Sequence, residues 1–283
     1  MSFSIIIPAK NEAEGLEKIL PDIKRLYPQA EVIVSDDGST DATAEVAERH
    51  GARVSSSPYS MGNGAAIKRG ARAASYDVLV MMDGDGQHQP SEIQRLLDAL
   101  DEGYDMVVGY RDSEGQANVS RGLANALYNR LASLITGHRI YDLTSGFRAV
   151  RADKFREFLY LLPNGFSYPT TSTMAFFRSA YPVKYVPVDV LARIGNSHIR
   201  PFRDGIRFLL IIFKIATLYS PLKLFLPTSG AFFITALGYY LYTYFSIGRF
   251  TNMSALLFSG AIIVFLIGLV SEQITALMYR RES

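Results

Sequence analysis

The sequence predicts an α/β protein with a parallel sheet, followed by a basic amphipathic helix and a two-helix membrane hairpin. Two observations carry this prediction. Strand-like and helix-like segments alternate over residues 1–200, and two long stretches without charge follow them. With 283 residues, of which 48% are hydrophobic and 20% charged, the chain has room for one fairly large domain and an appendage.

The alternation begins with the apolar stretch "FSIIIPA". Continuous apolar strands are expected at 3–9, 31–37, 76–83 and 104–110, and helices at 11–27, 40–50, 62–74 and 90–100. Continuous apolar strands separated by helices are typical of a parallel sheet covered on both faces. Pro21 is expected to interrupt the first helix, and Thr40 or Asp41 to cap the second.

Unusual polar clusters follow the expected strands. They are "PAKNE" at 8–12, "SDDGSTD" at 35–41, "DGDGQ" at 83–87 and "GYR" at 109–111. In open α/β sheets, ligands bind outside the carboxyl ends of the strands. The four clusters therefore predict one site at that edge.

The "DGDGQ" cluster predicts a divalent cation. Asp83 and Asp85 are one residue apart, and two carboxylates that close repel each other unless a cation lies between them. Together with the amide oxygen of Gln87 they offer part of an oxygen shell, and Mg²⁺ is usually held by one or two carboxylates plus substrate phosphates. A solvated loop is the alternative.

Two other clusters also have an alternative. "SDDGSTD" is equally typical of a strand-to-helix turn in which Asp36 or Asp37 only caps. "GNG" at 62–64, opening a helix, suits phosphate binding, but plain turn chemistry produces the same pattern.

Composition excludes several classes of site. Cysteine is absent, which rules out disulfides, thiolate nucleophiles and cysteine-ligated metal. The histidines, at 50, 88, 138 and 198, are too scattered to predict a zinc site, and a net charge of +2 gives no reason to expect nucleic acid as a partner.

The C-terminal region predicts a membrane hairpin. Residues 224–248 and 250–271 carry no charge, and each run exceeds the ~20 residues needed to cross a ~30 Å hydrocarbon core. Buried helices of a soluble core are the alternative, which two such runs in succession disfavour. Lys214, Lys223, Arg280 and Arg281 flank the hairpin on one side, whereas its tip has only Arg249. The positive-inside rule then places both the N-terminal domain and the C-terminus in the cytoplasm.

A basic amphipathic helix is expected just before the hairpin. Arg203, Arg207 and Lys214 fall within about 40° of each other at 100° per residue, with large apolar residues on the other faces. This pattern predicts a helix in the membrane interface, with an ordinary surface helix as the alternative. The expected organisation is a domain at 1–200, interfacial helices at 201–223 and a hairpin at 224–283.

These motifs resemble a known family. "IPAKNE", "VSDDGSTD" and "MMDGDGQHQP" are similar to the inverting family 2 glycosyltransferases, and "GYR", residues 120–150 and "RIGNSH" at 193–198 resemble their polyprenyl-phosphate branch. That branch includes dolichyl-phosphate mannose synthase and bacterial undecaprenyl-phosphate sugar transferases. The resemblance implies a Rossmann-like nucleotide-sugar-binding domain of the glycosyltransferase A type. It also implies transfer of one sugar to undecaprenyl or dolichyl phosphate, with inversion, at a plasma or inner membrane.

The resemblance implies a role for particular residues on the donor side. Pro8, Asn11 and Glu12 would line the nucleotide pocket and Asp36 would read the base. Asp83, Asp85 and Gln87 would hold Mg²⁺ or Mn²⁺ against the diphosphate. Arg193 and Ser197 would close over the pyrophosphate. The donor is expected to be a UDP-hexose, with GDP-mannose open, and a homo-oligomer is possible.

Further roles concern the acceptor. Arg111 and Arg121 would bind the lipid phosphate, and Asp142, with "TSGFR" after it, would border the sugar and acceptor site. Relatives commonly have lysine where this chain has His198, and "NGFSYPTTSTM" at 164–174 is expected to shape the acceptor channel.

Two other functions remain open at this point. A processive polysaccharide synthase would carry a Gln-x-x-Arg-Trp signature and more membrane spans, but this chain has no tryptophan. An inactive membrane-anchored scaffold would be expected to lose its ligands, and the chain retains Asp83, Asp85, Arg111 and Arg121.

Overall fold

The computed structural model describes residues 2–110, 128–130, 132–134, 136–165, 167–190, 213, 217 and 219–279. The chain divides into two compact units. The first comprises residues 1–130 and 138–199, and the second 131–137 and 200–283. The interfacial helix expected at 201–223 falls largely outside the described residues, so it stays a prediction.

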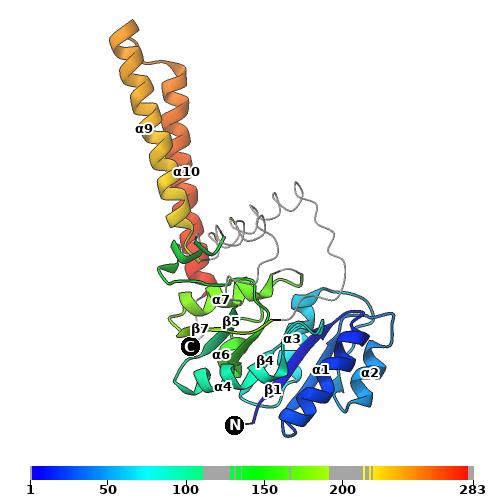
Figure 1. Cartoon of the computed structure of the whole chain (residues 1–283). Coiled ribbons are helices and arrows are strands. Elements are labelled where there is room, and N and C mark those ends of the chain that lie inside the picture. Colours follow the sequence, from blue (N-terminus) through cyan, green and yellow to red (C-terminus); the bar gives the residue numbers. More distant parts are fainter. Residues whose placement is uncertain are drawn as a thin grey trace. The chain divides into compact units, whose positions relative to one another are not determined.

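The first unit is built on a seven-stranded sheet in the order β3-β2-β1-β4-β6-β5-β7 (Figure 1). Its strands are β1 (Ser4–Ala9), β2 (Glu31–Asp36), β3 (Arg53–Val54), β4 (Val78–Met81), β5 (Met106–Tyr110), β6 (Arg148–Arg151) and β7 (Val183–Pro187). All neighbours pair in parallel except β6, which is antiparallel to both β4 and β5.

The expectation of a wholly parallel sheet is therefore wrong at β6. This strand has four residues and begins inside the polar "TSGFRAV" segment, so its apolar pattern is too short to stand out. Its direction matters for the site. Because β6 runs against its neighbours, the residues just before it lie at the edge where β4 and β5 end.

Helices cover both faces of the sheet. On one face lie α1 (Ala13–Leu26), α2 (Thr43–Arg49) and α4 (Ile93–Asp101), the last preceded by a 3₁₀ turn at Pro90–Glu92. On the other lie α3 (Asn63–Ala73), α6 (Ala152–Arg156) and α7 (Tyr168–Arg178). Successive side chains of β1 point to opposite faces of the sheet. Ile5 and Ile7 join the core beneath α1, whereas Ile6 lies against Gly70 of α3.

Two expected helix boundaries are corrected. Helix α1 continues through Pro21, which is exposed, and buries four apolar side chains on its inner face. Burying each of them gains about 1.5–3 kcal/mol, which together outweighs the roughly 3 kcal/mol that an interior proline costs. Helix α2 begins only at Thr43, where the Asp41 carboxylate accepts the Thr43 backbone N–H at 3.1 Å before the first turn.

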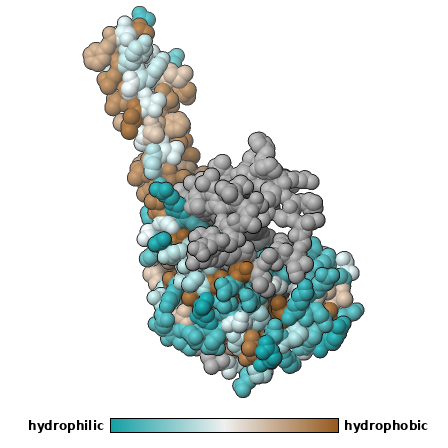
Figure 2. Space-filling view, viewed as in Figure 1, coloured by the Kyte–Doolittle hydropathy of each residue, from teal (hydrophilic) through white to brown (hydrophobic). Residues whose placement is uncertain are grey.

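The second unit contains the expected hairpin, formed by α9 (Pro221–Ile247) and α10 (Asn252–Met278). Each helix has 27 residues and therefore spans about 40 Å at 1.5 Å per residue. An 18-residue window reaches a mean hydropathy of 1.4 in α9 and 2.5 in α10, and these values and the helix lengths suit a membrane crossing. Most of their large apolar side chains are exposed, and Figure 2 shows hydrophobic residues along the hairpin surface.

Small residues form the seam between the two helices. Apart from Pro221 in the first turn of α9, the buried positions recur every seven residues: Ser229, Ala236 and Thr243 on α9, and Ser254, Ala261, Gly268 and Thr275 on α10. Small side chains allow close backbone approach, which is how apolar helices associate in lipid. A seven-residue period is also that of a left-handed supercoil.

The open end of the hairpin is held by a carboxylate. Glu272 of α10 accepts hydrogen bonds from the Leu222 backbone N–H at 3.1 Å and from the Ser220 hydroxyl at 3.4 Å. It therefore caps the first turn of α9 from the neighbouring helix, where a negative charge favours the helix dipole.

Candidate active site

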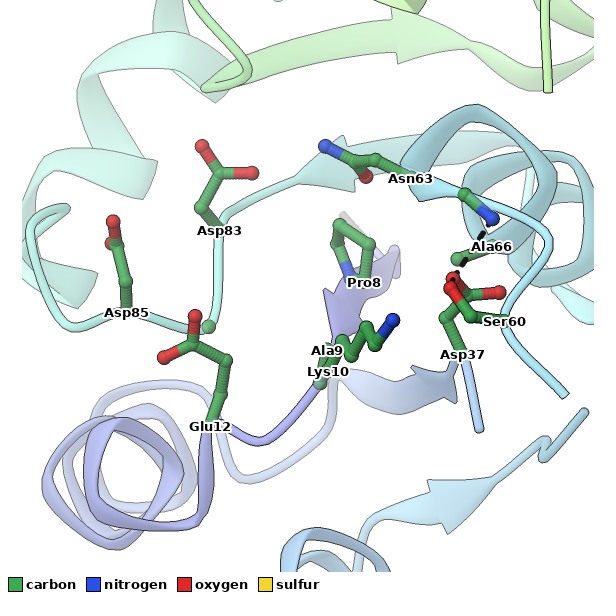
Figure 3. Close-up of a pocket in the computed structure, with 12 residues that line it drawn as sticks. Pro8, Ala9, Lys10, Glu12, Asp37, Ser60, Asn63, Ala66, Asp83 and Asp85 are labelled. Atoms are coloured by element: carbon green, nitrogen blue, oxygen red, sulfur yellow. Dashed lines mark hydrogen bonds between the residues drawn. The ribbon is translucent and has the colours of Figure 1, made fainter. Parts of the chain in front are cut away.

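A pocket of about 370 Å³ opens at the carboxyl edge of the sheet in the first unit (Figure 3). Its lining comes from the end of β1 and the residues after it, from the segments after β2 and β4, and from the loop before α3 and the start of that helix. The lining residues are Pro8, Ala9, Lys10, Glu12, Asp37, Ser60, Gly62, Asn63, Ala66, Asp83, Gly84 and Asp85.

The sheet register explains why these segments meet. Ala9 is paired with Asp36 across the β1–β2 ladder, and Ile6 with Met81 across the β1–β4 ladder. The three parallel strands thus run to the same edge of the sheet, although β4 ends three residues before β1, and the polar residues after them gather at that edge. Sequence reasoning predicted this convergence for the first three clusters, whereas Gly109 and Tyr110 of the fourth cluster do not line this pocket.

The "DGDG" loop is held tightly against α1. A Cβ atom on Gly15, in the first turn of α1, would lie 2.0 Å from the carbonyl oxygen of Gly84. Gly86 has a φ of +72°, which favours glycine. Asp83 and Asp85 are half-buried and line the pocket.

Figure 3 shows the carboxylates of Glu12, Asp83 and Asp85 at one side of the pocket. The described residues contain no cluster of three or more histidine, aspartate or glutamate side chains close enough to hold a metal ion by themselves. Two carboxylates and open space fit a cation that also takes oxygen ligands from a substrate. Gln87, expected as a third ligand, is not among the lining residues, and its backbone N–H donates to Asp85 Oδ1 at 3.1 Å.

Asp37 shapes the opposite side of the pocket. Its carboxylate accepts hydrogen bonds from the Ser60 hydroxyl at 2.7 Å and from the backbone N–H groups of Met61 and Gly62, each at 2.8 Å. Burial alone would raise the pKa of Asp37, but these hydrogen bonds hold it below its usual value. Asp37 therefore fixes the loop that leads into α3.

Asp36, expected to read the base, does not line the pocket. It is buried, and its Oδ1 accepts the Ser39 backbone N–H at 3.0 Å. Of the neighbouring pair it is Asp37 that faces the cavity. The sequence alone could not show which of the two aspartates faces the pocket, because this depends on where β2 ends.

Pro8 and Glu12 line the pocket as expected, and Asn11 does not. Asn11 has a φ of +55°, and its Oδ1 accepts the Thr40 backbone N–H at 2.8 Å, which ties the loop after β1 to the loop after β2. Lys10, in contrast, lines the pocket and is exposed. Its place in "PAKNE" was visible in the sequence, but no periodicity singles it out.

Another loop of the protein packs against part of the "GNG" segment. The Ala65 backbone N–H, in the first turn of α3, donates to the carbonyl oxygen of Asn164 at 2.9 Å. A Cβ atom on Gly64 would lie 2.0 Å from the Pro163 carbonyl oxygen. A loop therefore packs against part of this segment, as the turn alternative implies, whereas Gly62 and Asn63 line the pocket, so both alternatives remain.

The segment before β6 packs against the "DGDGQ" loop. A Cβ atom on Gly146 would lie 2.9 Å from Asp83 Oδ2, and the Phe147 ring stacks on His88 with centroids 4.9 Å apart. Asp142 Oδ1 accepts the backbone N–H groups of Thr144 at 2.9 Å and Ser145 at 3.1 Å. The "TSGFR" segment therefore packs against Asp83 and the loop that carries it.

The remaining predicted residues are placed as follows. Arg111, Arg121, Arg193, Ser197 and His198 lie outside the described residues. Of the "NGFSYPTTSTM" segment, Tyr168 to Met174 are buried in α7 and do not line the described pocket. The Tyr168 hydroxyl donates to the Gly146 carbonyl oxygen at 3.1 Å, so this segment supports the loop before β6.

The mixed sheet and the pocket at the ends of β1, β2 and β4 define a glycosyltransferase fold of the A type. The chain belongs to glycosyl transferase family 2, whose family model matches residues 4–159. The model of the GtrB C-terminal hairpin matches residues 220–277.

Relatives extend the similarity over the whole chain. Glycosyltransferase AglJ of Haloferax volcanii is 30% identical over 96% of this chain and 93% of its own length. Polyprenol monophosphomannose synthase of Mycolicibacterium smegmatis is 30% identical over 69% of this chain and 82% of its own. Undecaprenyl-phosphate mannosyltransferase of Micrococcus luteus is 33% identical over 68% and 85%.

Solved structures support the fold. Glucosyl-3-phosphoglycerate synthase from Mycobacterium tuberculosis, in complex with Mn²⁺, UDP and glucosyl-3-phosphoglycerate, superposes with a TM-score of 0.59. The similarity covers 75% of this chain and 79% of that one at 24% identity. At this identity the comparison establishes the shared architecture.

Proposed function

We propose that this chain transfers a single sugar from a nucleotide sugar to a polyprenyl phosphate. The observation that carries the proposal is the presence, in one family 2 chain, of a strand-end pocket with Asp83 and Asp85 and of a hairpin long enough to cross a membrane. Relatives named as polyprenyl- and undecaprenyl-phosphate sugar transferases support it.

The donor occupies the pocket in this account. Asp83 and Asp85 hold Mg²⁺ or Mn²⁺ against the donor diphosphate, with Gln87 as a further candidate ligand. When bound, the metal stabilises the charge that develops on the departing nucleoside diphosphate. Pro8, Glu12 and Lys10 line the pocket that receives the nucleotide, and the ammonium group of Lys10 favours the binding of a phosphate there.

Other donor assignments remain proposals. Asn11 and Asp36 contribute by fixing the loops after β1 and β2, as their hydrogen bonds suggest. Arg193 and Ser197 close over the pyrophosphate. A UDP-hexose is the preferred donor, with GDP-mannose as the second candidate.

The acceptor attacks through an oxygen of its phosphate. A phosphate monoester has a second pKa near ~6, so it is largely ionised at neutral pH and needs no strong general base. Arg111 and Arg121 bind this phosphate, because guanidinium groups match phosphate oxygens in a bidentate manner. Asp142 borders the acceptor, and attack from the face opposite the nucleotide inverts the anomeric carbon.

The hairpin anchors the enzyme where its acceptor lies. A polyprenyl tail stays in the hydrocarbon core while its phosphate sits at headgroup level, so an anchored domain meets the phosphate without extracting the lipid. The basic residues that flank the hairpin support a cytoplasmic position, at a plasma membrane, for the catalytic domain and the C-terminus. A homo-oligomer is compatible with this arrangement.

A product assay tests the proposal. The purified full-length protein is incubated in detergent with undecaprenyl phosphate, Mg²⁺ or Mn²⁺ and a panel of UDP- and GDP-sugars, and lipids are analysed by mass spectrometry. We expect a lipid that has gained one sugar, and no product when EDTA replaces the metal. Nucleotide binding without any glycolipid from the panel contradicts the acceptor assignment.

A further inference from the structure

The largest fully buried side chain described in this protein is that of Arg148, the first residue of β6. It is paired with Met81 of β4 on one side and with Val108 of β5 on the other. Its exposed fraction is 0%. A guanidinium stays charged at neutral pH, and a buried charge is costly unless it is compensated.

The partners of Arg148 carry no charge. Its Nη1 donates to the Pro169 carbonyl oxygen at 3.0 Å, to Ser172 Oγ at 2.9 Å and to Thr173 Oγ1 at 3.1 Å. Its Nη2 donates to the carbonyl oxygen of Ser145, and its Nε, within the described part of the chain, has no hydrogen-bond partner. Neutral dipoles thus orient the guanidinium and leave its charge unneutralised.

Two carboxylates of the site interact with this charge. Burial lowers the pKa of Arg148, and its interactions with Tyr168 and Tyr185, followed by those with the carboxylates of Asp142 and Asp83, oppose this shift. Both carboxylates are within its electrostatic reach without forming an ion pair with it. In a medium of low dielectric constant such an interaction is felt over longer distances than in water.

Arg148 also holds the backbone segment that follows Asp142 and that lies against Asp83. The Ser145 carbonyl oxygen that it binds is one residue before Gly146, which lies against Asp83. The Ser145 backbone N–H donates to Asp142 at 3.1 Å. A shift of Ser145 therefore moves the supports of both Asp83 and Asp142.

We infer that Arg148 is a positioning residue and the fixed cation of the donor site. It anchors the segment that joins Asp142 to β6 and that lies against Asp83. Its positive charge offsets the charge of both carboxylates, so that a diphosphate can enter beside them. This inference rests on the proposed function. It has a distinctive consequence, because a buried positive charge favours an anion in the pocket and opposes a cation. Loss of the charge must change the two affinities in opposite directions.

The test uses the full-length protein in detergent and two probes, Mn²⁺ alone and UDP alone in EDTA. Mn²⁺ binding is followed by the loss of the free-ion electron paramagnetic resonance signal, and UDP binding by calorimetry. For Arg148→Met, we expect Mn²⁺ to bind about three- to tenfold more tightly and UDP about three- to tenfold more weakly. A structural role alone would weaken both, and that result overturns the inference.

The matched control is Arg148→Lys, which keeps the charge but loses the planar fork. We expect both affinities to stay within about twofold of the wild type, while turnover falls because Ser145 is held less firmly. If Arg148→Met does not fold, Arg148→Lys provides the test. Unchanged Mn²⁺ and UDP affinities with reduced turnover support the inference, and a parallel loss of both affinities overturns it. Wild-type protein that binds neither probe refutes the proposed donor site itself, which separates the two failures.

Discussion

At the residue scale, the site depends on glycines that let backbone approach a carboxylate. Gly146 is the clearest, since a Cβ atom there would lie 2.9 Å from one Asp83 oxygen and 3.1 Å from the other. Asp83 is therefore held at a fixed distance by the backbone of a segment far away in sequence. The geometry of the proposed metal site follows from that contact.

Gly146→Ala is expected to displace Asp83. A misplacement of about 1 Å at a reacting centre costs on the order of 100-fold in rate, so we expect glycolipid formation to fall by roughly 10- to 100-fold. The matched control is Gly165→Ala, because a Cβ atom at Gly165 meets nothing within 4 Å. Equal activity of the two variants in steady-state assays would contradict the account of this contact.

Asp37→Asn is expected to destabilise the first unit in a pH-dependent way. Hydrogen bonds hold the pKa of Asp37 below its usual value, so the charged form is favoured in the folded state. Its contribution is complete above the unfolded pKa of about 3.9 and is lost as pH falls through the lower folded pKa.

Thermal unfolding measures this effect. At pH 7 we expect the variant to lose about 1–3 kcal/mol, as for hydrogen bonds to a charged group. The difference from the wild type should shrink below about pH 4. A difference that is constant down to acid pH would show that the Asp37 charge does not contribute.

The sequence predicted much of the pocket at this scale and missed particular contacts. Pro8, at the end of β1, and Glu12, Asp83 and Asp85, shortly after strand ends, line it because of that position, which apolar patterning reveals. Arg148 is different. A charged residue within "TSGFR" reads as a surface or ligand residue, but Arg148 is buried because β6 lies between β4 and β5 and α7 packs against its side chain.

At the scale of elements, the hairpin shows how helix packing is encoded without polar patterning. The seam uses one small residue every seven positions on each helix. Both helices were expected from their charge-free runs, but their contact face was not, because apolar residues occupy every face. The missed signal was the interval between small residues, which was present in the sequence.

Gly268→Ala is expected to weaken this seam. A Cβ atom at Gly268 would lie 2.6 Å from Phe225 Cβ, and overpacking of this kind typically costs about 1–3 kcal/mol. Gly260→Ala, on the same helix, is the control, since its nearest neighbour is 3.8 Å away. In heat denaturation in detergent, Gly268→Ala should unfold at a lower midpoint temperature than the wild type, and Gly260→Ala should not. Identical midpoints would contradict the predicted close packing.

At the scale of the whole molecule, the chain joins a soluble-type catalytic unit to an apolar hairpin. The sequence predicted this division because charge-free runs of membrane length stand out against an alternating α/β pattern. It did not predict that residues 131–137 group with the hairpin. Such a long-range association leaves no periodic signature.

Truncation after Phe225 tests the membrane attachment. We expect the shortened protein to remain partly bound to vesicles that contain anionic lipid, through the basic helix expected at 201–223, and to be released by high salt. Flotation assays of full-length and truncated protein measure this directly. Complete release at low salt would show that the hairpin alone attaches the chain.

The most direct test of the central claim compares the wild type with Asp85→Asn in the glycolipid assay. The exchange keeps the size of the side chain and removes one carboxylate from the pocket. We predict that the wild type forms a polyprenyl-phosphate lipid carrying one sugar, and that the variant, with an unchanged melting temperature, forms none at any Mg²⁺ or Mn²⁺ concentration. Equal product from both proteins would contradict a role for this pocket in sugar transfer.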